Sequence, residues 1–290
     1  MLLVTGATGL IGSELLALLT AAGEPVRCLV RDPRRLGAER VRVQIVLGDL
    51  ADRRSLANAV RGADRVIHLA AANEDQAEGT IEELGSIATW RLIEAAEAAG
   101  VKQLSFFSAL GAGRGAPTRL LRDKALAENA VAAARIATTT FALSLAHASN
   151  DPLATAIESC SRLGAVPAPG SGHYQPIWVP DIAAAVAAHL ASEIKPGHQR
   201  IELAGPQTLS ARTISRLIIS SLGRRRPALP SSSRFAKIVL RLTGPGPPTL
   251  PMLWDPQALL NTEMLSQRGV SDAQALGISP RRFSDVLGLD

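Results

Sequence analysis

The first half of the chain alternates short apolar runs, rich in β-branched residues or leucine, with amphipathic segments. The apolar runs have the length of buried strands and occupy residues 2–5, 26–30, 41–46, 66–69, 104–107 and 138–144. The segments between them carry apolar residues at helical spacing and occupy residues 10–22, 55–61, 81–99 and 119–134. Because repeated strand-then-helix units are right-handed βαβ crossovers, the pattern predicts an α/β fold with a doubly wound parallel sheet.

The second half of the chain loses this regular alternation. A helix-like segment at 152–163 is followed by a stretch rich in glycine and proline, an alanine-rich helix, a strand at 200–203 and a helix from Ser210. We therefore expect a doubly wound domain over residues 1–146. A smaller α+β lobe over residues 147–290 should be partly interleaved with it.

Composition excludes several classes of protein. The 290 residues include 31 basic and 26 acidic side chains, and the formal charge of +5 suits a small anionic ligand. Five Phe, three Trp and one Tyr offer few surfaces for stacking nucleic-acid bases, so no nucleic-acid partner is expected. Cys28 and Cys160 lie far apart and the five histidines lack metal-ligand spacing, which predicts no disulfide, no metal and a reducing, cytoplasmic location. The longest apolar run, 182–191, is too short to span a membrane.

The sequence TGATGLIG, residues 5–12, joins the first predicted strand to the first predicted helix. Gly6 permits a tight turn, Gly9 lets backbone N–H groups approach a diphosphate, and Gly12 allows the helix to pack closely on the sheet. The helix then offers unpaired N–H donors and the positive end of its dipole to an anion. We therefore predict a dinucleotide-binding Rossmann domain rather than a plain glycine-rich corner. The other predicted contacts in this turn are Thr8, Leu10 and Ile11.

The end of the second predicted strand bears on the choice of dinucleotide. A site for NAD(H) places a carboxylate there to bind the ribose 2′-hydroxyl, whereas the sequence VRCLVRDP places Arg31 at that point. A guanidinium can bind a 2′-phosphate through two hydrogen bonds, so NADP(H) is favoured over NAD(H). The alternative is that Arg31 is a solvated charge and that Asp32 supplies the carboxylate.

Several motifs, taken in order over about residues 1–210, resemble the atypical extended short-chain dehydrogenase/reductase family. They are TGATGLIG, LVRDP, GDL at 48–50, VIHLAA at 66–71, VKQLSFFSALGA at 101–112, LLRDKALAE at 120–128 and ELAGPQTLS at 202–210. The pattern is most similar to the NmrA-like proteins and to the nucleotide-binding accessory subunit of respiratory complex I. The resemblance implies that Asp49 and Leu50 lie near the adenine. It also implies that Ala70 and Ala71 line the cofactor.

The family that the chain resembles passes a proton between a tyrosine and the substrate, aided by a lysine four residues later and a nearby hydroxyl. In this chain the lysine is Lys124, which the resemblance also places on the nicotinamide ribose, but Leu120 stands where the tyrosine would be. The usual hydroxyl pair is reduced to Ser108 beside Ala109. Lys124 and Ser108 are therefore the remaining candidates for catalytic residues of the usual kind.

The missing phenol leaves two hypotheses for the function. The first is a dinucleotide-binding protein without ordinary carbonyl reduction, which acts as a redox sensor or as an accessory or assembly factor with a protein partner. The second is an active NADP-dependent oxidoreductase or nucleotide-sugar epimerase that uses a non-standard proton donor. Tyr174, His147 or a water molecule could be that donor, and Glu74 and Asp75 are substitute acids unless they only form an exposed loop.

The C-terminal lobe offers candidate contacts for a substrate. His147 follows the sixth predicted strand, at the sheet edge where α/β proteins bind ligands. Its neighbours Asn150 and Asp151 could line the same pocket or cap a helix. Tyr174 lies in the loop GSGHYQPIWVPD, which the resemblance returns to the cleft, although a surface turn is the alternative. Asp181 is predicted to cap the alanine-rich helix.

Overall fold

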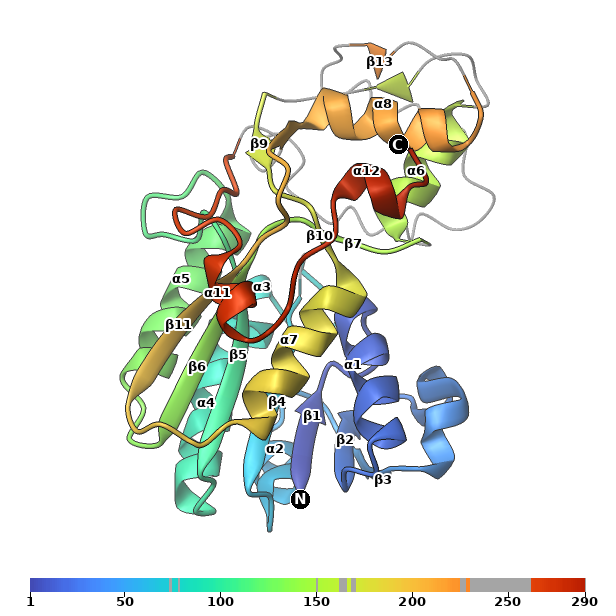
Figure 1. Ribbon diagram of the computed structural model, residues 1–290. Coiled ribbons are helices and arrows are strands. Elements are labelled where there is room, and N and C mark those ends of the chain that lie inside the picture. The colour runs from blue at the N-terminus through green and yellow to red at the C-terminus, as the bar shows by residue number, and fades with distance from the viewer. Residues whose placement is uncertain are drawn as a thin grey trace.

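The computed structural model describes residues 1–72, 75–77, 79–149, 151–161, 166–167, 171–224, 228–229 and 262–289. Its centre is a seven-stranded parallel sheet with the strand order β11-β6-β5-β4-β1-β2-β3 (Figure 1). The strands are β1 (Leu2–Thr5), β2 (Val26–Val30), β3 (Gln44–Leu47), β4 (Arg65–His68), β5 (Gln103–Ala109), β6 (Ala137–Leu143) and β11 (His198–Leu203). The order reverses at β1, which lies between β4 and β2, so the sheet is doubly wound as predicted.

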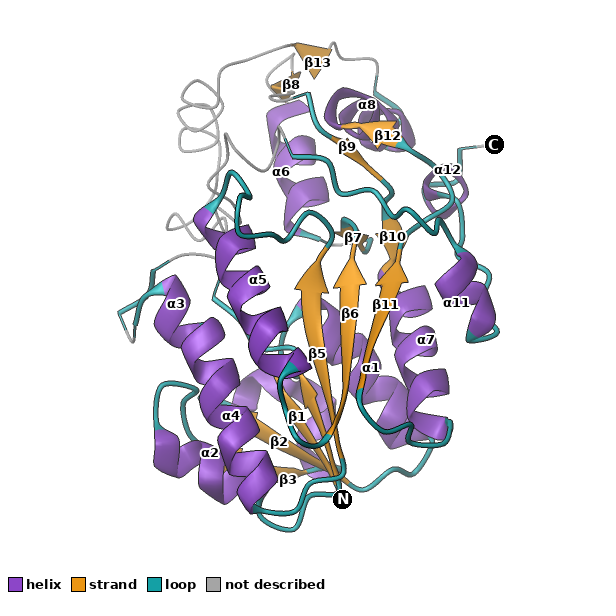
Figure 2. Ribbon diagram, turned by 90° about the vertical axis from the view of Figure 1, so that its left-hand side faces the viewer, coloured by secondary structure: helices purple, strands orange, loops and turns teal. Residues whose placement is uncertain are grey.

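Helices cover both faces of this sheet (Figure 2). α1 and α7 pack together against one face, while α2, α4 and α5 pack side by side against the other. Their bounds are α1 (Leu10–Ala21), α2 (Arg53–Val60), α4 (Ser86–Ala98), α5 (Arg119–Ala132) and α7 (Val179–Ala191). The inner strands β1, β2 and β5 are buried on both sides, so they appear in the sequence as nearly unbroken apolar runs.

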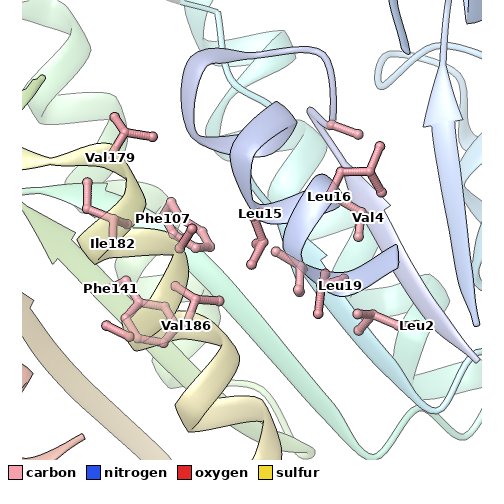
Figure 3. Close-up of a cluster of buried hydrophobic side chains, with 14 of the residues drawn as sticks. Leu2, Val4, Leu15, Leu16, Leu19, Phe107, Phe141, Val179, Ile182 and Val186 are labelled. Carbon is pink, nitrogen blue, oxygen red and sulfur yellow. The ribbon is translucent and has the colours of Figure 1, made fainter. Parts of the chain in front are cut away.

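Both halves of the chain contribute to the core between the sheet and the α1 and α7 helices (Figure 3). Leu15 of α1, Phe141 of β6 and Ile182 of α7 are completely buried there. Strand β11 belongs to the same half as α7 and pairs in parallel with residues 138–143 of β6. Residues 179–203 therefore complete the central layer that the first half begins.

The segment predicted as one helix over residues 81–99 is two helices, α3 (Ile81–Leu84) and α4, with a break at Gly85. A Cβ at Gly85 would lie 2.0 Å from Oδ2 of Asp123 and 2.6 Å from the carbonyl oxygen of Ile81. Asp123 lies on α5 and accepts the N–H of Ser86, so it satisfies the first turn of α4 from a distance in sequence. Helical spacing could not reveal this break, because a carboxylate from another helix creates it.

The third predicted strand begins later than expected. Asp32 accepts the N–H two residues on, and Pro33 occupies the first helical position, so a 3-10 helical segment, η1 (Pro33–Val41), forms there. Strand β3 consequently covers Gln44–Leu47 instead of 41–46. The capping carboxylate and the proline explain the difference.

A smaller α+β group lies beyond the carboxyl ends of the strands (Figure 1). It contains three short strand pairs, β7 with β10, β9 with β12 and β8 with β13, and it has its own apolar core. The elements outside the central layer are α6 (Pro152–Ser161), α8 (Ala211–Ser221), α11 (Ser271–Ala275), α12 (Phe283–Val286), β7 (Ala146–His147), β8 (Val166–Pro167), β9 (His173–Tyr174), β10 (Ile177–Trp178), β12 (Leu209–Ser210) and β13 (Ala228–Leu229). Of these, α11 packs beside β11.

Within residues 262–289, α11 and Arg281 contact elements of the central layer. The prediction that Asp181 caps α7 is wrong, because the helix begins after Trp178 and both oxygens of Asp181 bind Arg281. Asp181 therefore fastens the C-terminal segment to α7. Asp272 acts similarly on β11, since its Oδ2 accepts the N–H of Glu202 at 2.8 Å.

Within the described ranges, no helix is long and apolar enough to cross a membrane. The same ranges hold no group of three or more histidine, cysteine or carboxylate side chains that could bind a metal ion. Cys28 is buried in β2, and this burial raises the pKa of its thiol to about 12. The thiol therefore stays protonated and unreactive at neutral pH.

Candidate functional site

A cavity of 640 Å³ opens at the carboxyl ends of β1, β2 and β4. The strand order reverses at this edge, which is where open α/β sheets bind their ligands. The lining includes these predicted cofactor contacts: Gly6, Thr8, Gly9, Arg31, Asp49, Leu50, Ala70 and Ala71. Leu10, Ile11 and Gly12 lie in the first turn of α1 beside the cavity, and Lys124 lies outside its lining.

The glycine turn brings three pieces of backbone into close contact. Gly6 has a φ of +75°, and a Cβ there would lie 2.5 Å from the nitrogen of Ala70. A Cβ at Gly12 would lie 2.1 Å from the carbonyl oxygen of Gly6. Gly9 is looser, because its Cβ would meet that same oxygen at 3.3 Å. Gly9 is also the N-cap of α1 and has no side chain that could cover the helix's first N–H groups. The turn therefore presents bare donors to the cavity.

Charged side chains of both signs line the end of the cavity formed by β2. Arg31 and Arg35 both line it, and Arg31 donates to Oε1 of Gln76 at 3.3 Å and lies 3.9 Å from an oxygen of Asp49. Asp32 also lines this end, but one of its oxygens already caps η1. Sequence reasoning missed Arg35. Arg35 lies three residues after the capping Asp32, on the first turn of a helical segment. This spacing could have predicted that it faces the same end of the cavity.

A buried hydrogen-bond chain supports the floor of the cavity. Thr89 donates to the carbonyl oxygen of Gly85 at 2.8 Å, so its Oγ1 accepts from Nε2 of His68 at 3.1 Å. Nδ1 of His68 is then the acceptor for Oγ1 of Thr5, 2.7 Å away, and Thr5 lines the cavity. Burial, reinforced by the charge of Lys124, lowers the pKa of His68 to about 3, so the ring is neutral. His68 is therefore a structural residue of the core.

Lys124 lies on α5 against the end of β5. Its Nζ donates a hydrogen bond to the carbonyl oxygen of Phe107 at 2.8 Å and lies 5.0 Å from the centre of the Phe106 ring. Burial lowers the pKa of the Lys124 ammonium to about 8, although the charge of neighbouring Asp123 opposes the shift. The side chain can therefore hold or release a proton near neutral pH, which is a property suited to a reaction site.

The other members of the expected relay lie close to Lys124 in the fold. Ser108, on β5, is 5 % exposed, and its Oγ has no hydrogen-bond partner in the part of the chain that the structure describes. Leu120 lies one turn before Lys124 on α5 and packs against the core of the smaller group. Leu120 has no group that could carry a proton. The catalytic roles of Lys124 and Ser108 stay predictions, since neither lines the cavity.

His147 and Tyr174, the predicted substrate contacts, are both buried outside the cavity lining. Nδ1 of His147 lies 2.6 Å from Oδ2 of Asp151, and the ring contacts Phe283 edge-on. Asp151 also accepts two backbone N–H groups near the start of α6. Tyr174 lies in β9, where burial raises the pKa of its phenol. Their roles toward a substrate stay predictions. Glu74 and Asn150 lie outside the described residues.

Comparison with known proteins adds a decisive observation, because residues 6–191 match the model of a family described as NAD(P)H-binding. The chain belongs to this NAD(P)H-binding family. The matched stretch contains the three glycines of the turn, every residue of the cavity lining except Thr5, and the helix that carries Lys124. The predicted Rossmann fold and the prediction of an NAD(P)(H) cofactor are thereby confirmed.

Three curated relatives match different shares of the chain. NAD(P)H azoreductase of Xenophilus azovorans is 32% identical over 228 residues, which are 77% of this chain and 74% of that relative. Mitochondrial NADH dehydrogenase [ubiquinone] 1 alpha subcomplex subunit 9 of Arabidopsis thaliana is 28% identical over 74% of this chain and 56% of its own length. Sterol demethylase protein B of Methylococcus capsulatus is 36% identical over 38% of this chain. The chain spans only about a third (34%) of that last relative.

Solved structures agree on the fold. The crystal structure of NADPH-dependent quinone oxidoreductase from Escherichia coli, complexed with NADPH, superposes with a TM-score of 0.77 and covers 99% of both chains at 21% identity. At that identity the likeness concerns the fold alone. The family match and the relatives confirm the predicted atypical short-chain dehydrogenase/reductase class.

Proposed function

We propose that the chain is an NADP(H)-dependent oxidoreductase that works without the tyrosine of the usual relay. The observation that carries the proposal is the contrast between two parts of the site. The glycine turn and two arginines line an open cavity, whereas the family resemblance puts Leu120, on α5, at the position of the proton donor. The cavity thus offers backbone N–H groups and guanidinium groups to a dinucleotide, but the relay lacks the acid that a simple carbonyl substrate requires.

The residues present fit a dinucleotide. The turn is open at Gly9, and the first N–H groups of α1 can donate hydrogen bonds to a diphosphate there. Arg31 and Arg35 support NADP(H) over NAD(H), because a guanidinium binds a phosphate through two charge-assisted hydrogen bonds. Asp32 is a poor alternative ligand for a ribose hydroxyl, since its Oδ1 caps η1. By the family resemblance, Lys124 would hold the nicotinamide ribose.

The absence of a phenol at position 120 points to a particular class of acceptor. The bound dinucleotide supplies a hydride. Hydride addition to a simple ketone develops a localised negative charge, and a positioned acid is needed to neutralise it. A conjugated azo group spreads that charge, so water can supply the proton. The name of the Xenophilus relative, NAD(P)H azoreductase, supports this class of acceptor.

Calorimetric titration of the protein with NADPH and, separately, with NADH tests the cofactor. We expect NADPH to bind with a micromolar or lower Kd and NADH to bind at least tenfold more weakly. This difference in binding free energy is roughly that of one charge-assisted hydrogen bond. Equal affinities would refute the NADP(H) preference. The absence of heat and of a thermal shift with both dinucleotides would refute the proposed function.

NADPH oxidation with an azo dye and with an aliphatic ketone tests the acceptor. We expect the dye to be reduced and the ketone to be consumed at the background rate. Comparable rates with both acceptors would show that another acid replaces the tyrosine. Gly9→Ala is a suitable control, because it should remove the activity through cofactor binding alone.

A redox-sensing or accessory role is the second candidate. The match to the complex I subunit over 74% of this chain favours it. Under this hypothesis NADPH still binds, but neither acceptor is reduced above background. The two assays together therefore separate the candidates.

A further inference from the structure

Residues 75–77 and 79–84, here called the wall segment, form one side of the cavity. Gln76 and Leu84 line the cavity directly. Gln76 and Gly79 exchange two backbone hydrogen bonds of 2.9 and 3.2 Å, which close a tight turn. Ile81 and Leu84 are buried, whereas residues 75–77 are exposed. The position of the exposed part therefore depends on polar contacts.

Arg119 makes those contacts from the first position of α5. Its Nη1 donates to Oδ2 of Asp75 at 2.8 Å. Its Nε donates to Oε1 of Glu82 at 2.6 Å, and its Nη2 donates to Oε2 of the same carboxylate. One guanidinium thus holds both ends of the wall segment, through a two-bond pair at Glu82 and a single bond at Asp75.

Local hydrogen bonds join the parts of the wall segment to one another. Thr80 and Glu83 form a capping box, in which the N–H of Glu83 reaches Thr80 and the N–H of Thr80 reaches Glu83. Oδ1 of Asp75 accepts the N–H of Ile81 at 2.9 Å. If Arg119 releases its two carboxylates, the exposed part of the wall segment and the start of α3 lose their ion pairs with α5 together.

The wall segment is also connected to the phosphate-binding end of the cavity. Arg31 donates to Gln76 at 3.3 Å. Arg119 connects the same segment to α5, the helix that carries Lys124. The segment therefore joins the end of the cavity where a 2′-phosphate would lie to the helix that would hold the nicotinamide ribose.

We propose that Arg119 is a positioning residue that sets the affinity and the residence time of the dinucleotide by holding Gln76 and Leu84 against the cavity. This inference rests on the proposed cofactor site. Arg119 itself lies outside the lining and touches no reacting atom. The planar guanidinium is essential to the arrangement, because an ammonium group at this position is a point charge and cannot bind a carboxylate through two parallel hydrogen bonds.

The test compares Arg119→Gln with Arg135→Gln. Arg135 is a matched control, since its Nε and Nη2 bind Oε2 of Glu97 at 2.9 and 2.6 Å, near the end of α4 far from Gly85. Both variants lose an exposed arginine–carboxylate pair, but only Arg119 touches the wall segment. The Kd for NADPH is measured by titration, and the dissociation rate by stopped-flow fluorescence of the bound nicotinamide.

Arg119→Gln should raise the Kd roughly fivefold, the size expected for an exposed ion-pair network, with most of the change in the dissociation rate. Arg135→Gln should leave both values unchanged. Turnover with an azo dye at saturating NADPH should be the same in Arg119→Gln and the wild type, so that KM for NADPH changes and kcat does not. Arg119→Lys should recover only part of the affinity.

Three outcomes are decisive. If the wild type binds neither NADPH nor NADH, the proposed function fails and the inference fails with it. If the wild type binds NADPH and Arg119→Gln binds it equally well, the inference alone is overturned. If Arg119→Gln does not fold, Glu82→Gln replaces it, because it keeps the size of the side chain and removes the charge. An unchanged Kd in that variant likewise overturns the inference.

Discussion

The two ends of the candidate site are built from different chemical groups. At the glycine turn, the contacts come mainly from backbone, and the important sequence requirement is the absence of a Cβ at Gly6 and Gly12. At the opposite end, the candidate groups are individual side chains, and two of them are committed to structural bonds. Lys124 binds a carbonyl oxygen of β5, and His147 binds Asp151. Under the proposed function, dinucleotide binding would depend mainly on chain geometry, whereas the reaction would depend on single residues such as the one at position 120.

The largest expected effect comes from Gly12→Ala, which tests whether the glycine turn depends on the absence of a Cβ. The new Cβ would lie 2.1 Å from the carbonyl oxygen of Gly6, so the backbone of the turn must move. We expect the free energy of unfolding to fall by about 3 kcal/mol and NADPH binding to be lost. Chemical denaturation and titration measure the two effects.

Gly9→Ala is the control for that variant. Its Cβ would meet the same oxygen at 3.3 Å, so the fold should be nearly unaffected while the diphosphate loses room. Equal losses of stability in both variants would contradict the assignment of Gly9 to the ligand and Gly12 to the fold.

The next effect concerns Lys124 and how the free energy of unfolding depends on pH. Burial lowers the pKa of Lys124 to about 8 in the folded protein, from a usual value near 10.5. Below pH 8 both the folded and the unfolded states carry this proton. Between pH 8 and 10.5 the unfolded state binds more protons, so stability rises with pH there.

The difference between wild type and Lys124→Met isolates this contribution. We expect the wild type to gain on the order of 3 kcal/mol relative to the variant over that range. Denaturation at pH 7 and at pH 10 measures it. A constant difference would show that Lys124 is solvated.

Arg31→Leu has a smaller effect, on selectivity. Loss of the guanidinium should weaken NADPH binding about tenfold to a hundredfold, because a hydrogen bond to a charged group is worth about 1.5–3 kcal/mol. NADH affinity should change little, since NADH has no 2′-phosphate. A parallel loss for both dinucleotides would mean that Arg31 supports the cavity, through Gln76 or Asp49, rather than the phosphate.

The last prediction, for which we expect no change at all, concerns the titration of the His68 ring. The pKa of His68 is lowered to about 3 by burial, so its ring should remain neutral across the physiological range. NMR spectra of the ring should show no midpoint between pH 5 and 8. A titration midpoint near pH 6.5 would contradict the buried hydrogen-bond chain from Thr5 through His68 to Thr89.

The sequence alone predicts the sheet and the glycine turn well, because both depend on short-range patterns. Buried strands read as apolar runs, and the spacing of Gly6, Gly9 and Gly12 implies a turn between strand and helix. The placement of Arg31, Asp49 and Ala70 around one cavity follows from parallel topology, which brings the carboxyl ends of the strands to a common edge. Their contacts with the dinucleotide stay predictions.

Features that depend on partners distant in sequence could not be predicted. Asp181 has the position of a helix cap, yet it binds Arg281, one hundred residues later. The break at Gly85 needs Asp123 from another helix. The ion pairs of Arg119 with Asp75 and Glu82 span 44 and 37 residues. Spacing along a chain reports which face a residue occupies, but it does not report which charges meet across helices.

The late position of β11 and α7 in the sequence has a consequence for biosynthesis. On a ribosome, the glycine turn emerges first, but its sheet lacks an edge strand and one covering helix until Leu203 has been translated. The nascent chain would therefore expose the edge of β6 and the apolar side of α1 until then. Cofactor binding should become available only late, and we expect molecular chaperones to protect the growing chain until then.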